Sequence, residues 1–414
     1  MNIKAIRGTK DVLPQEAKIW RAIEEKARSL FALYGYGEIR TPILEEASLF
    51  TRSIGQSSDI VRKEMYAFAD RKKRMLCLRP EATASVVRAF LEHGLDKDNQ
   101  LVKLYYFGPM FRAERPQAGR LRQFHHIGVE AIGSSSPYLD AEVISLAVEI
   151  LGKTTLKGFT VHLNSIGSQQ DRSNYKLLLK KELKDKLKRL CADCRQRYKL
   201  NLMRIFDCKN SACKAIIHEL PTINESLGEE SKDHFKKVQE IIDSLDIPYT
   251  LNPYLVRGLD YYTHTCFEIV HPNLGAQNAL GAGGRYDDLT HDLGGGKIPA
   301  IGFALGLERI IAALEPQKTM PDPGCVFIAV LGSEAMELGF KLLHSLRRQG
   351  ISSEIDYQGK SLKAQMRLAD RLGSRYVVIL GEDEIKKQKA VLRDMREKTQ
   401  NEVSLSNLVK ELGR

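Results

Sequence analysis

Residues 107–130 read FGPMFRAERPQAGRLRQFHHIGVE and predict two antiparallel strands joined by a basic loop, which a proline and a glycine punctuate. Side chains alternate along a strand, so the returning strand places Phe124, His126 and Glu130 on one face. Buried charges are costly unless they are paired, and few protein cores tolerate a face of this kind. The segment therefore predicts a sheet surface with a role other than core packing.

The incoming strand adds Arg112 and Glu114 to the same face. An arginine suits a phosphate, an aromatic ring suits a flat base, and a carboxylate suits a cation or a hydrogen-bond donor. The pattern favours a binding surface for a charged ligand. An exposed hairpin with a solvated face would show the same alternation and is the alternative.

The composition of the 414 residues, with 43% hydrophobic and 28% charged, is typical of a globular protein. The length predicts two or three domains. No apolar run approaches the length of about 18 residues that a membrane span needs, and the N-terminus lacks the apolar region of a signal peptide. The seven cysteines are odd in number and unevenly placed, which argues against a secreted disulfide framework. We therefore expect a cytoplasmic protein without a membrane partner.

The net charge of +11 is concentrated in residues 172–214, which hold 14 Lys and Arg against four Asp and Glu. A local excess favours a polyanionic partner, and a solvated helix is the alternative. The same segment carries Cys191, Cys194, Cys208 and Cys213, which could bind zinc tetrahedrally. The second spacing fits a zinc finger only loosely, so incidental cysteines are the preferred interpretation and we assign no metal.

Two further segments carry candidate ligand-binding side chains. Glu81 and Thr83 lie where a predicted strand runs into a helix, and a carboxylate there can cap the helix or bind a ligand. Arg257 lies in a short loop before two tyrosines, which suits an anionic ligand. A salt bridge between Arg257 and Asp260 that only staples the loop is the alternative.

Residues 275–284 predict a glycine-rich turn that a ligand could approach closely, although no P-loop follows. Residues 302–309 alternate small and large side chains and end in Arg309, at a strand-to-helix transition. Small residues on one face would allow a flat ligand to lie against the strand. Tight packing of a helix would explain the glycines equally well.

The elements predict an α+β core built on an antiparallel sheet, interrupted by a helical insertion and followed by a C-terminal α/β domain. The core comprises residues 1–167 and 248–318, and the charged helical insertion comprises residues 168–247. Strands and helices alternate over residues 324–414, which predicts the α/β domain.

In this order the segments resemble the class II aminoacyl-tRNA synthetases, and closely resemble the bacterial histidyl-tRNA synthetases. The resemblance covers nearly the whole chain. The matching segments are residues 7–14, the helix before Pro42 (motif 1), residues 107–130 (motif 2), 255–262 and 281–286 (two histidine-specific signatures), and 302–309 (motif 3). The resemblance implies a homodimer that ligates L-histidine to tRNA(His) through a histidyl-adenylate, using ATP and Mg²⁺.

The resemblance also implies roles for individual residues. Arg112 and Arg257 would be catalytic, because their charge would stabilise the reacting phosphate. The residues implied for histidine binding are Glu81, Thr83, Arg112, His126, Glu130, Arg257, Tyr261, Tyr262 and Tyr286. Those implied for ATP are Arg112, Glu114, Arg120, Phe124 and Arg309, and those for the tRNA acceptor end are Arg115 and Gln117.

One position departs from the family pattern. Residues 125–126 are His-His, where the family commonly has His-Gln and the glutamine contacts the bound amino acid. A neutral imidazole can form a hydrogen bond but does not reproduce both functions of an amide. We therefore expect a retained pocket with altered contacts at His126.

A synthetase-like regulatory subunit of histidine biosynthesis, which binds histidine without charging tRNA, is the alternative function. Such proteins generally lack the C-terminal anticodon-binding domain. This chain keeps Arg112, Arg257, Arg309 and an α/β segment after residue 324, and these features favour the enzyme.

Overall fold

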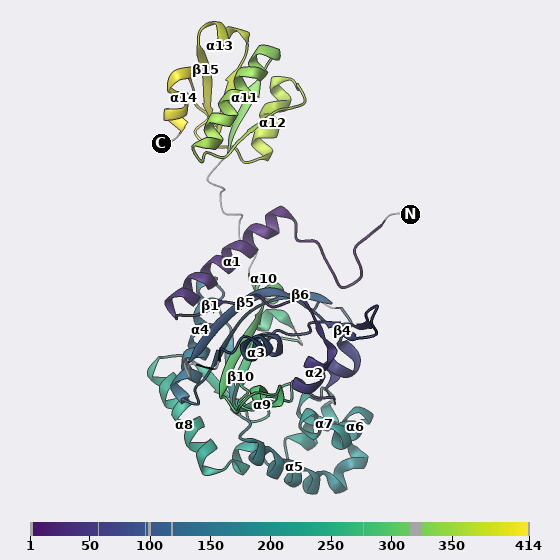
Figure 1. Cartoon of the computed structure of the whole chain (residues 1–414). Helices are drawn as coiled ribbons and strands as arrows, with labels where there is room; N and C mark the ends of the chain where they lie inside the picture. Colours follow the sequence, from purple (N-terminus) through teal and green to yellow (C-terminus); the bar gives the residue numbers. More distant parts are fainter. Residues whose placement is uncertain are drawn as a thin grey trace. The chain divides into compact units, whose positions relative to one another are not determined.

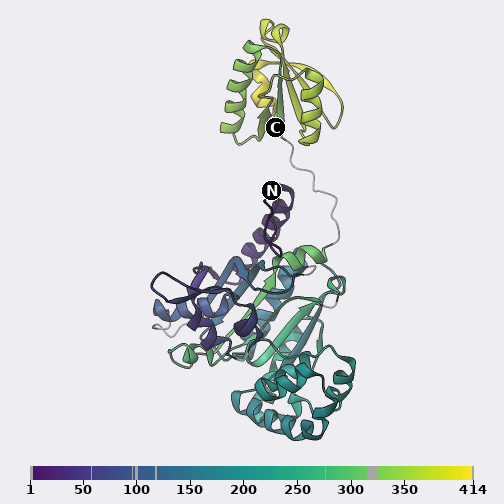
Figure 2. The same cartoon turned by 90° about the vertical axis from the view of Figure 1, so that its right-hand side faces the viewer.

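The computed structural model describes residues 3–56, 58–95, 97, 101–116, 119–275, 277–314 and 325–412. The chain divides into two compact units, Met1–Glu315 and Pro316–Arg414, which are drawn in Figures 1 and 2. Among the described residues, no helix is long and apolar enough to cross a membrane.

An eight-stranded sheet forms the centre of the first unit, in the order β1-β5-β6-β11-β10-β9-β7-β8 (Figure 1). Its inner pairings are antiparallel, and only the edge pairs β1–β5 and β7–β8 are parallel. The predicted antiparallel α+β core is therefore confirmed. The strands are β1 (Gly37–Glu38), β5 (Val102–Phe111), β6 (Gln123–Ile132), β7 (Thr160–Ser165), β8 (Tyr249–Leu251), β9 (Thr263–Val270), β10 (Ala279–Arg285) and β11 (Ala300–Gly306).

One face of this sheet is covered by helices α1 (Pro14–Leu33), α4 (Pro137–Lys153), α8 (Glu229–Ser244) and α10 (Leu307–Ala313). Helix α1 buries side chains at helical spacing, including Trp20, Ile23 and Ala27, against this face. Strand β6 contributes Ile127 and Val129 to the same apolar core. The alternate residues of β6 consequently face the other side of the sheet, where the candidate site lies.

Smaller elements border that other side. Helix α3 (Thr83–Glu92) begins there, and a three-stranded sheet of order β2-β4-β3 precedes it in the chain. The remaining small elements are β2 (Leu44–Glu46), α2 (Ala47–Ser53), the π-helical turn Ile60–Glu64, β3 (Ala67–Ala69), β4 (Met75–Leu78), the 3₁₀ turn Pro272–Leu274 and α9 (Leu289–Asp292).

The glycine-rich segment 275–284 was expected to be a turn, and this prediction is wrong, because Ala279–Arg285 is strand β10. A Cβ atom on Gly281 would lie 2.7 Å from the Cα of Leu305, and one on Gly283 would lie 2.6 Å from the Phe267 ring. The glycines therefore allow close packing inside the sheet.

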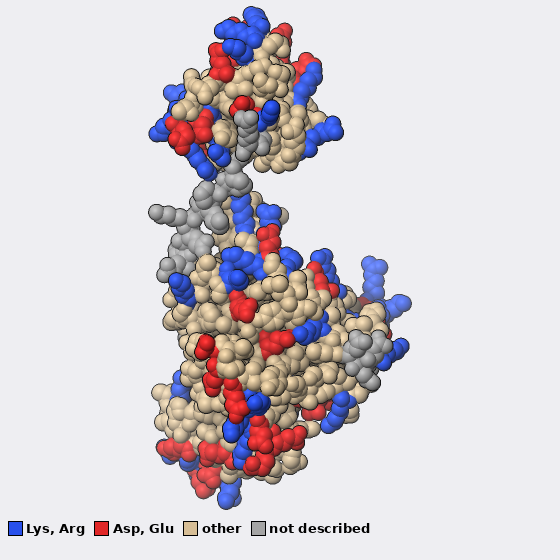
Figure 3. Space-filling model, turned by 90° about the vertical axis from the view of Figure 1, so that its left-hand side faces the viewer, with Lys and Arg blue, Asp and Glu red and all other residues tan. Residues whose placement is uncertain are grey.

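A helical segment connects β7 to β8 and is drawn in teal in Figure 2. The buried apolar residues of its first three helices join a second core together with residues of α2 and α3, whereas those of α8 belong to the first core. The elements are α5 (Gln169–Leu183), α6 (Ala192–Leu200), α7 (Ser211–Ile217) and α8, with 3₁₀ turns at Lys184–Arg189, Leu202–Asp207 and Ile223–Ser226. On the face drawn in Figure 3, acidic and basic side chains interleave.

The second unit is an α/β domain, as the alternation of its elements predicts. Its five-stranded sheet has the order β13-β12-β14-β15-β16, with β13, β12 and β14 parallel and the last two pairings antiparallel. Helices cover both of its faces. Its elements are β12 (Val326–Val330), α11 (Ser333–Arg348), β13 (Ser353–Ile355), α12 (Leu362–Arg371), β14 (Tyr376–Leu380), α13 (Glu382–Lys386), β15 (Lys389–Asp394), β16 (Gln400–Ser404) and α14 (Leu405–Leu412).

A fully buried ion pair joins α4 to β10. The guanidinium of Arg285 lies 2.6 Å from the carboxylate of Asp140, and neither side chain is exposed. His234 contacts the second oxygen of Asp140 at 2.8 Å. Removing Asp140 would leave the buried guanidinium with the partly exposed carboxylate of Asp287, 3.3 Å away, as its remaining acidic partner, and an incompletely compensated charge in the core is costly.

We expect Asp140→Ala to lower the free energy of unfolding of the first unit by about 3–5 kcal/mol, because Arg285 stays buried. Glu240→Ala is the matched control, since Glu240 pairs with Lys237 at the surface; its effect should stay within about 0.5 kcal/mol. Denaturant unfolding compares the two variants. Equal effects would contradict a structural role for the buried pair.

Candidate functional site

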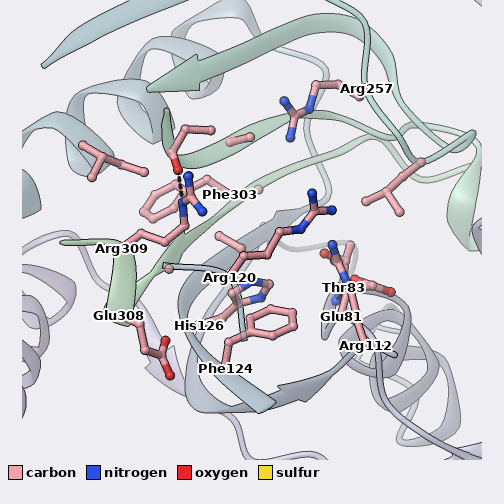
Figure 4. A pocket seen from close by; sticks show the side chains of 18 of the residues that line it. Glu81, Thr83, Arg112, Arg120, Phe124, His126, Arg257, Phe303, Glu308 and Arg309 are labelled. Carbon is pink, nitrogen blue, oxygen red and sulfur yellow. Dashed lines mark hydrogen bonds between the residues drawn. The ribbon is translucent and has the colours of Figure 1, made fainter. Parts of the chain in front are cut away.

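A cavity of about 250 Å³ opens on the face of the large sheet opposite α1 (Figure 4). Strands β6, β10 and β11, the start of α3 and the loop 255–262 line it. The sequence-predicted residues that line it are Glu81, Thr83, Arg112, Glu114, Arg120, Phe124, His126, Glu130, Arg257, Tyr261, Tyr262, Tyr286 and Arg309. Arg115 is not among the lining residues, and Gln117 lies outside the described residues.

A buried carboxylate, Glu130 of β6, forms the deep end of the cavity. It accepts hydrogen bonds from the hydroxyls of Thr83 at 2.7 Å, Tyr286 at 2.5 Å and Tyr106 at 3.3 Å. Burial raises the pKa of Glu130 to about 8, although the hydrogen bonds from Tyr286 and Thr83 oppose the shift. The group can therefore change its protonation state when a ligand arrives.

A second buried carboxylate, Glu81, lies at the start of α3. It accepts hydrogen bonds from the backbone N–H groups of Thr83 at 2.5 Å and Ala84 at 3.0 Å. Helix capping and a place in the cavity are thus compatible, although the sequence presented them as alternatives. Burial raises the pKa of Glu81 as well.

Three phenols adjoin the two carboxylates. The rings of Tyr261 and Tyr262 are 4.8 Å apart, and Tyr286 lies 5.8 Å from Tyr261. Burial raises the pKa of Tyr262 to about 12. The phenols therefore stay neutral, and each hydroxyl can donate one hydrogen bond and accept others.

Four arginines line the cavity, and Figure 4 shows Arg120, Arg257 and Arg309 around it and Arg112 beside Glu81 and Thr83. The Nε atom of Arg112 donates to the carbonyl of Pro80 at 2.9 Å, and its guanidinium lies 5.3 Å from the ring centre of Phe124. Arg120 pairs with Glu114. The arrangement offers concentrated positive charge beside an aromatic ring, which suits a phosphorylated base.

Arg257 pairs with Glu268 of β9 at 2.8 Å. The sequence offered Asp260 as the salt-bridge partner of Arg257, whereas the ion pair in the structure is with Glu268; Asp260 accepts a hydrogen bond from the amide of Asn201 at 2.9 Å. Burial of Arg257 is offset by the charge of Glu268, which raises the arginine's pKa. The guanidinium is therefore held as a permanent cation.

Arg309 follows β11 and enters the cavity from the first turn of α10. It donates to the carbonyls of Ala279 and Gln277, and to that of Gly119 at 3.0 Å. All three partners are neutral carbonyls. Its positive charge is therefore left for a ligand.

The two adjacent histidines of β6 face opposite sides of the sheet. His126 packs edge-on against Phe124 in the cavity, with ring centres 5.1 Å apart, and its buried Nδ1 has no hydrogen-bond partner. His125 contacts Glu308 at 2.9 Å and the core residue Trp20. Burial, followed by the charge of Arg112, lowers the pKa of His126 to about 3, so this imidazole is neutral.

Several contributors to the site were not identified from the sequence. Tyr106 bonds to Glu130 from the neighbouring strand β5, where it lies opposite Gly128. A Cβ atom on Gly128 would clash with the phenol ring of Tyr106, so the glycine makes room for this side chain. Glu268 and Glu308 hold Arg257 and His125. Tyr106 could have been found from the alternation of side chains along residues 102–112, which places it on the same face as Arg112.

Comparisons with known proteins agree along the whole chain. The family model described as histidyl-tRNA synthetase matches residues 8–310, and the model described as anticodon binding domain matches residues 325–414. The histidine–tRNA ligase of Halothermothrix orenii is 48% identical and covers 100% of this chain and 99% of its own length. That of Clostridioides difficile is 46% identical, with the same coverage. The crystal structure of apo S. aureus histidyl-tRNA synthetase matches with a TM-score of 0.84 and 38% identity, covering 100% of both chains.

We expect the ring nitrogens of His126 to keep the neutral pattern from pH 8 down to pH 5, because protonation would place a second cation beside Arg112. Long-range ¹⁵N spectra of histidine-labelled protein measure this, and the signal lost in His126→Gln assigns the residue. A titration midpoint between pH 5 and 7 would contradict the buried, unpaired geometry.

Proposed function

The chain belongs to the histidyl-tRNA synthetase family, and we propose that it is a histidine–tRNA ligase that joins L-histidine to tRNA(His) through a histidyl-adenylate. The reaction consumes ATP and releases AMP and pyrophosphate. One observation carries the proposal: a single cavity is lined both by buried carboxylates with phenols and by four arginines. An amino acid and a nucleotide can therefore meet inside it.

Histidine occupies the carboxylate end in this proposal. Glu130, with the phenols of Tyr261, Tyr262 and Tyr286, takes the imidazole, while Glu81 and Thr83 take the amino group. His126 borders the histidine from β6. A buried set of donors and acceptors rejects analogues without the matching nitrogens by about 10⁴–10⁵, so discrimination needs no separate editing step.

ATP occupies the arginine end. Phe124 stacks on the adenine with Glu114 as a hydrogen-bond acceptor, and Arg120 and Arg309 take the outer phosphates. Arg112 lies over Phe124 and reaches toward Glu81, so it can bridge the α-phosphate and the histidine carboxylate. These assignments follow the charge and shape of the lining side chains.

Neither half of the reaction needs a protein nucleophile. The histidine carboxylate attacks the α-phosphorus in line, and pyrophosphate leaves. Arg112 and Arg257 stabilise the charge that develops at phosphorus. A terminal ribose hydroxyl of tRNA then attacks the activated carbonyl and AMP leaves, with Arg115 and Gln117 assigned to the acceptor end.

Mg²⁺ fits the donor set of the cavity. Glu114 and Glu308 are carboxylates of the cavity lining, and oxygen ligands of this kind suit an ion bound mainly through phosphates. Bound with ATP, Mg²⁺ would neutralise part of the phosphate charge. The arginines do the remaining positioning.

We also propose a cytoplasmic homodimer. Helix α1, which corresponds to motif 1, exposes Ile19 and Leu33, and Leu13 just before it and Ile43 and Leu44 after it are exposed as well. Exposed large apolar side chains on such elements are consistent with a surface that another copy covers. Size measurement in solution tests this assignment.

The domain assignment completes the proposal. Residues 1–167 and 248–318 form the catalytic core, residues 168–247 the insertion, and residues 324–414 bind the anticodon. A regulatory subunit that binds histidine without charging tRNA is not favoured, because full-length relatives are histidine–tRNA ligases and the anticodon-binding model matches the second unit.

We expect histidine-dependent ATP–pyrophosphate exchange, and a loss of about 10²–10³ in its kcat for Arg257→Ala, because a cation at the reacting phosphate is removed. Arg40→Ala is the control, since the Arg40 side chain is 80% exposed and does not line the cavity. A wild-type chain that binds histidine but shows no exchange would favour the regulatory alternative. Wild-type exchange by Arg257→Ala would remove this residue from the catalytic set.

We expect histidine binding at pH 7 to release a proton, because Glu130 has a pKa of about 8 and is mostly neutral before binding. Ligand N–H groups favour the carboxylate, which lowers this pKa and frees the proton. Calorimetry in buffers with different ionisation enthalpies measures the release. It should shrink in Glu130→Gln and persist in Glu92→Gln, a change at an exposed carboxylate; equal release from both variants would contradict the assignment.

A further inference from the structure

Four cysteines of the helical segment converge on one point. The sulfur atoms of Cys191, Cys194, Cys208 and Cys213 all lie within 4.8 Å of one another, and none of the four forms a disulfide. Three are buried and Cys191 is half-buried. They come from separate pieces of chain: the N-cap and first turn of α6, the residue after the turn Leu202–Asp207, and α7.

The spacing of these sulfurs is that of a tetrahedral metal site. With zinc–sulfur bonds of about 2.3 Å, a tetrahedron places its sulfurs about 3.8 Å apart. The sulfurs of Cys191 and Cys208 are 3.8 Å apart. A disulfide would instead need about 2.05 Å.

The backbone around the cluster already favours thiolates. The N–H of Cys194 points to the sulfur of Cys191 at 3.5 Å, and the N–H of Cys191 points to that of Cys213 at 3.2 Å. Hydrogen bonds donated to a ligand sulfur orient the ligand and stabilise its negative charge. Four thiolates around Zn²⁺ carry a net charge of −2, and the surrounding segment 172–214 has 14 basic against four acidic residues.

We propose that Cys191, Cys194, Cys208 and Cys213 bind one Zn²⁺ ion as a closed structural site. The sequence favours incidental cysteines because the Cys208–Cys213 spacing departs from a finger. In the structure, helix α7 places Cys213 beside the other three cysteines, so the unusual Cys208–Cys213 spacing does not prevent all four sulfurs from binding one ion. With four protein ligands the ion has no open position, so its role is to fix structure rather than to react.

The site also supports the loop that carries Arg257. Arg204 lies in the turn that ends at Cys208, and it donates to the carbonyl of Gly258 at 3.3 Å. Asn201, before the same turn, donates to Asp260 at 2.9 Å. Zinc that anchors this turn therefore positions loop 255–262 against the cavity. The expected effect of zinc on histidine binding rests on the proposed function, whereas the zinc site itself does not.

The test begins with the full-length chain purified under reducing conditions without added metal. We expect elemental analysis to find about one zinc per chain, and much less in Cys208→Ser and Cys213→Ser. Cys77→Ser is the matched control, since Cys77 is buried in β4 outside the cluster, and it should keep its zinc. Cys213→His, which restores a ligand, should recover binding.

Substitution of the wild-type chain with Co²⁺ keeps the proposal testable if the serine variants do not fold. We expect the visible spectrum of tetrahedral cobalt bound to four thiolates. The zinc site would be overturned if the purified wild-type chain contained no metal and also gave no tetrahedral cobalt spectrum after Co²⁺ was added. Iron in place of zinc in the purified chain would overturn it as well.

Removal of zinc by a chelator tests the coupling. We expect metal-free protein to bind histidine several-fold more weakly and to regain affinity on adding Zn²⁺. Unchanged histidine affinity in zinc-free protein would overturn the coupling and leave the site intact. Absence of histidine binding in the zinc-loaded chain would instead count against the proposed function.

Discussion

The buried carboxylate of Glu130 constrains the site more than any other group. Its hydroxyl partners come from three places, the start of α3, strand β5 and the residue after β10, so one side chain ties together elements that are far apart in sequence. Gly302 faces it on β11, where a Cβ atom would lie 2.8 Å from the carboxyl carbon. A buried acid with this many partners fixes the elements around it, because losing any one of them leaves a polar group unsatisfied.

The alternation of side chains on β6 separates two environments within one strand. Ile127 and Val129 enter the apolar core under α1, while His126 and Glu130 enter the cavity. A shift of register by one residue would exchange the two sets and bury the charges in the core. The apolar face thus specifies the register that the functional face requires.

Local patterns in the sequence were sufficient for the hairpin, the α/β character of residues 325–412 and much of the cavity lining, whereas Arg120 and Tyr286 were implied only by the resemblance to a known family. They were insufficient where the deciding contact is remote. Gly281 looked like part of a turn because its crowding partner, Leu305, lies on another strand. The partner of Arg257 is Glu268, across a turn into β9, and not the nearer Asp260. The cysteines converge only because α6 and α7 fold back on each other, which spacing does not reveal.

Arginines of the first unit differ in the charge of their partners. Arg285 is neutralised by Asp140 and Asp287, so it has no charge left to offer and serves the fold. Arg309 instead donates to neutral carbonyls, and Arg112 donates to the carbonyl of Pro80 and lies 3.9 Å from the carboxylate of Glu114, which also pairs with Arg120. Burial lowers the pKa values of Arg112 and Arg309. Burying a cation without a full counter-charge is costly. The fold sustains that cost where a polyphosphate can supply the missing negative charge, which is the end of the cavity assigned to ATP.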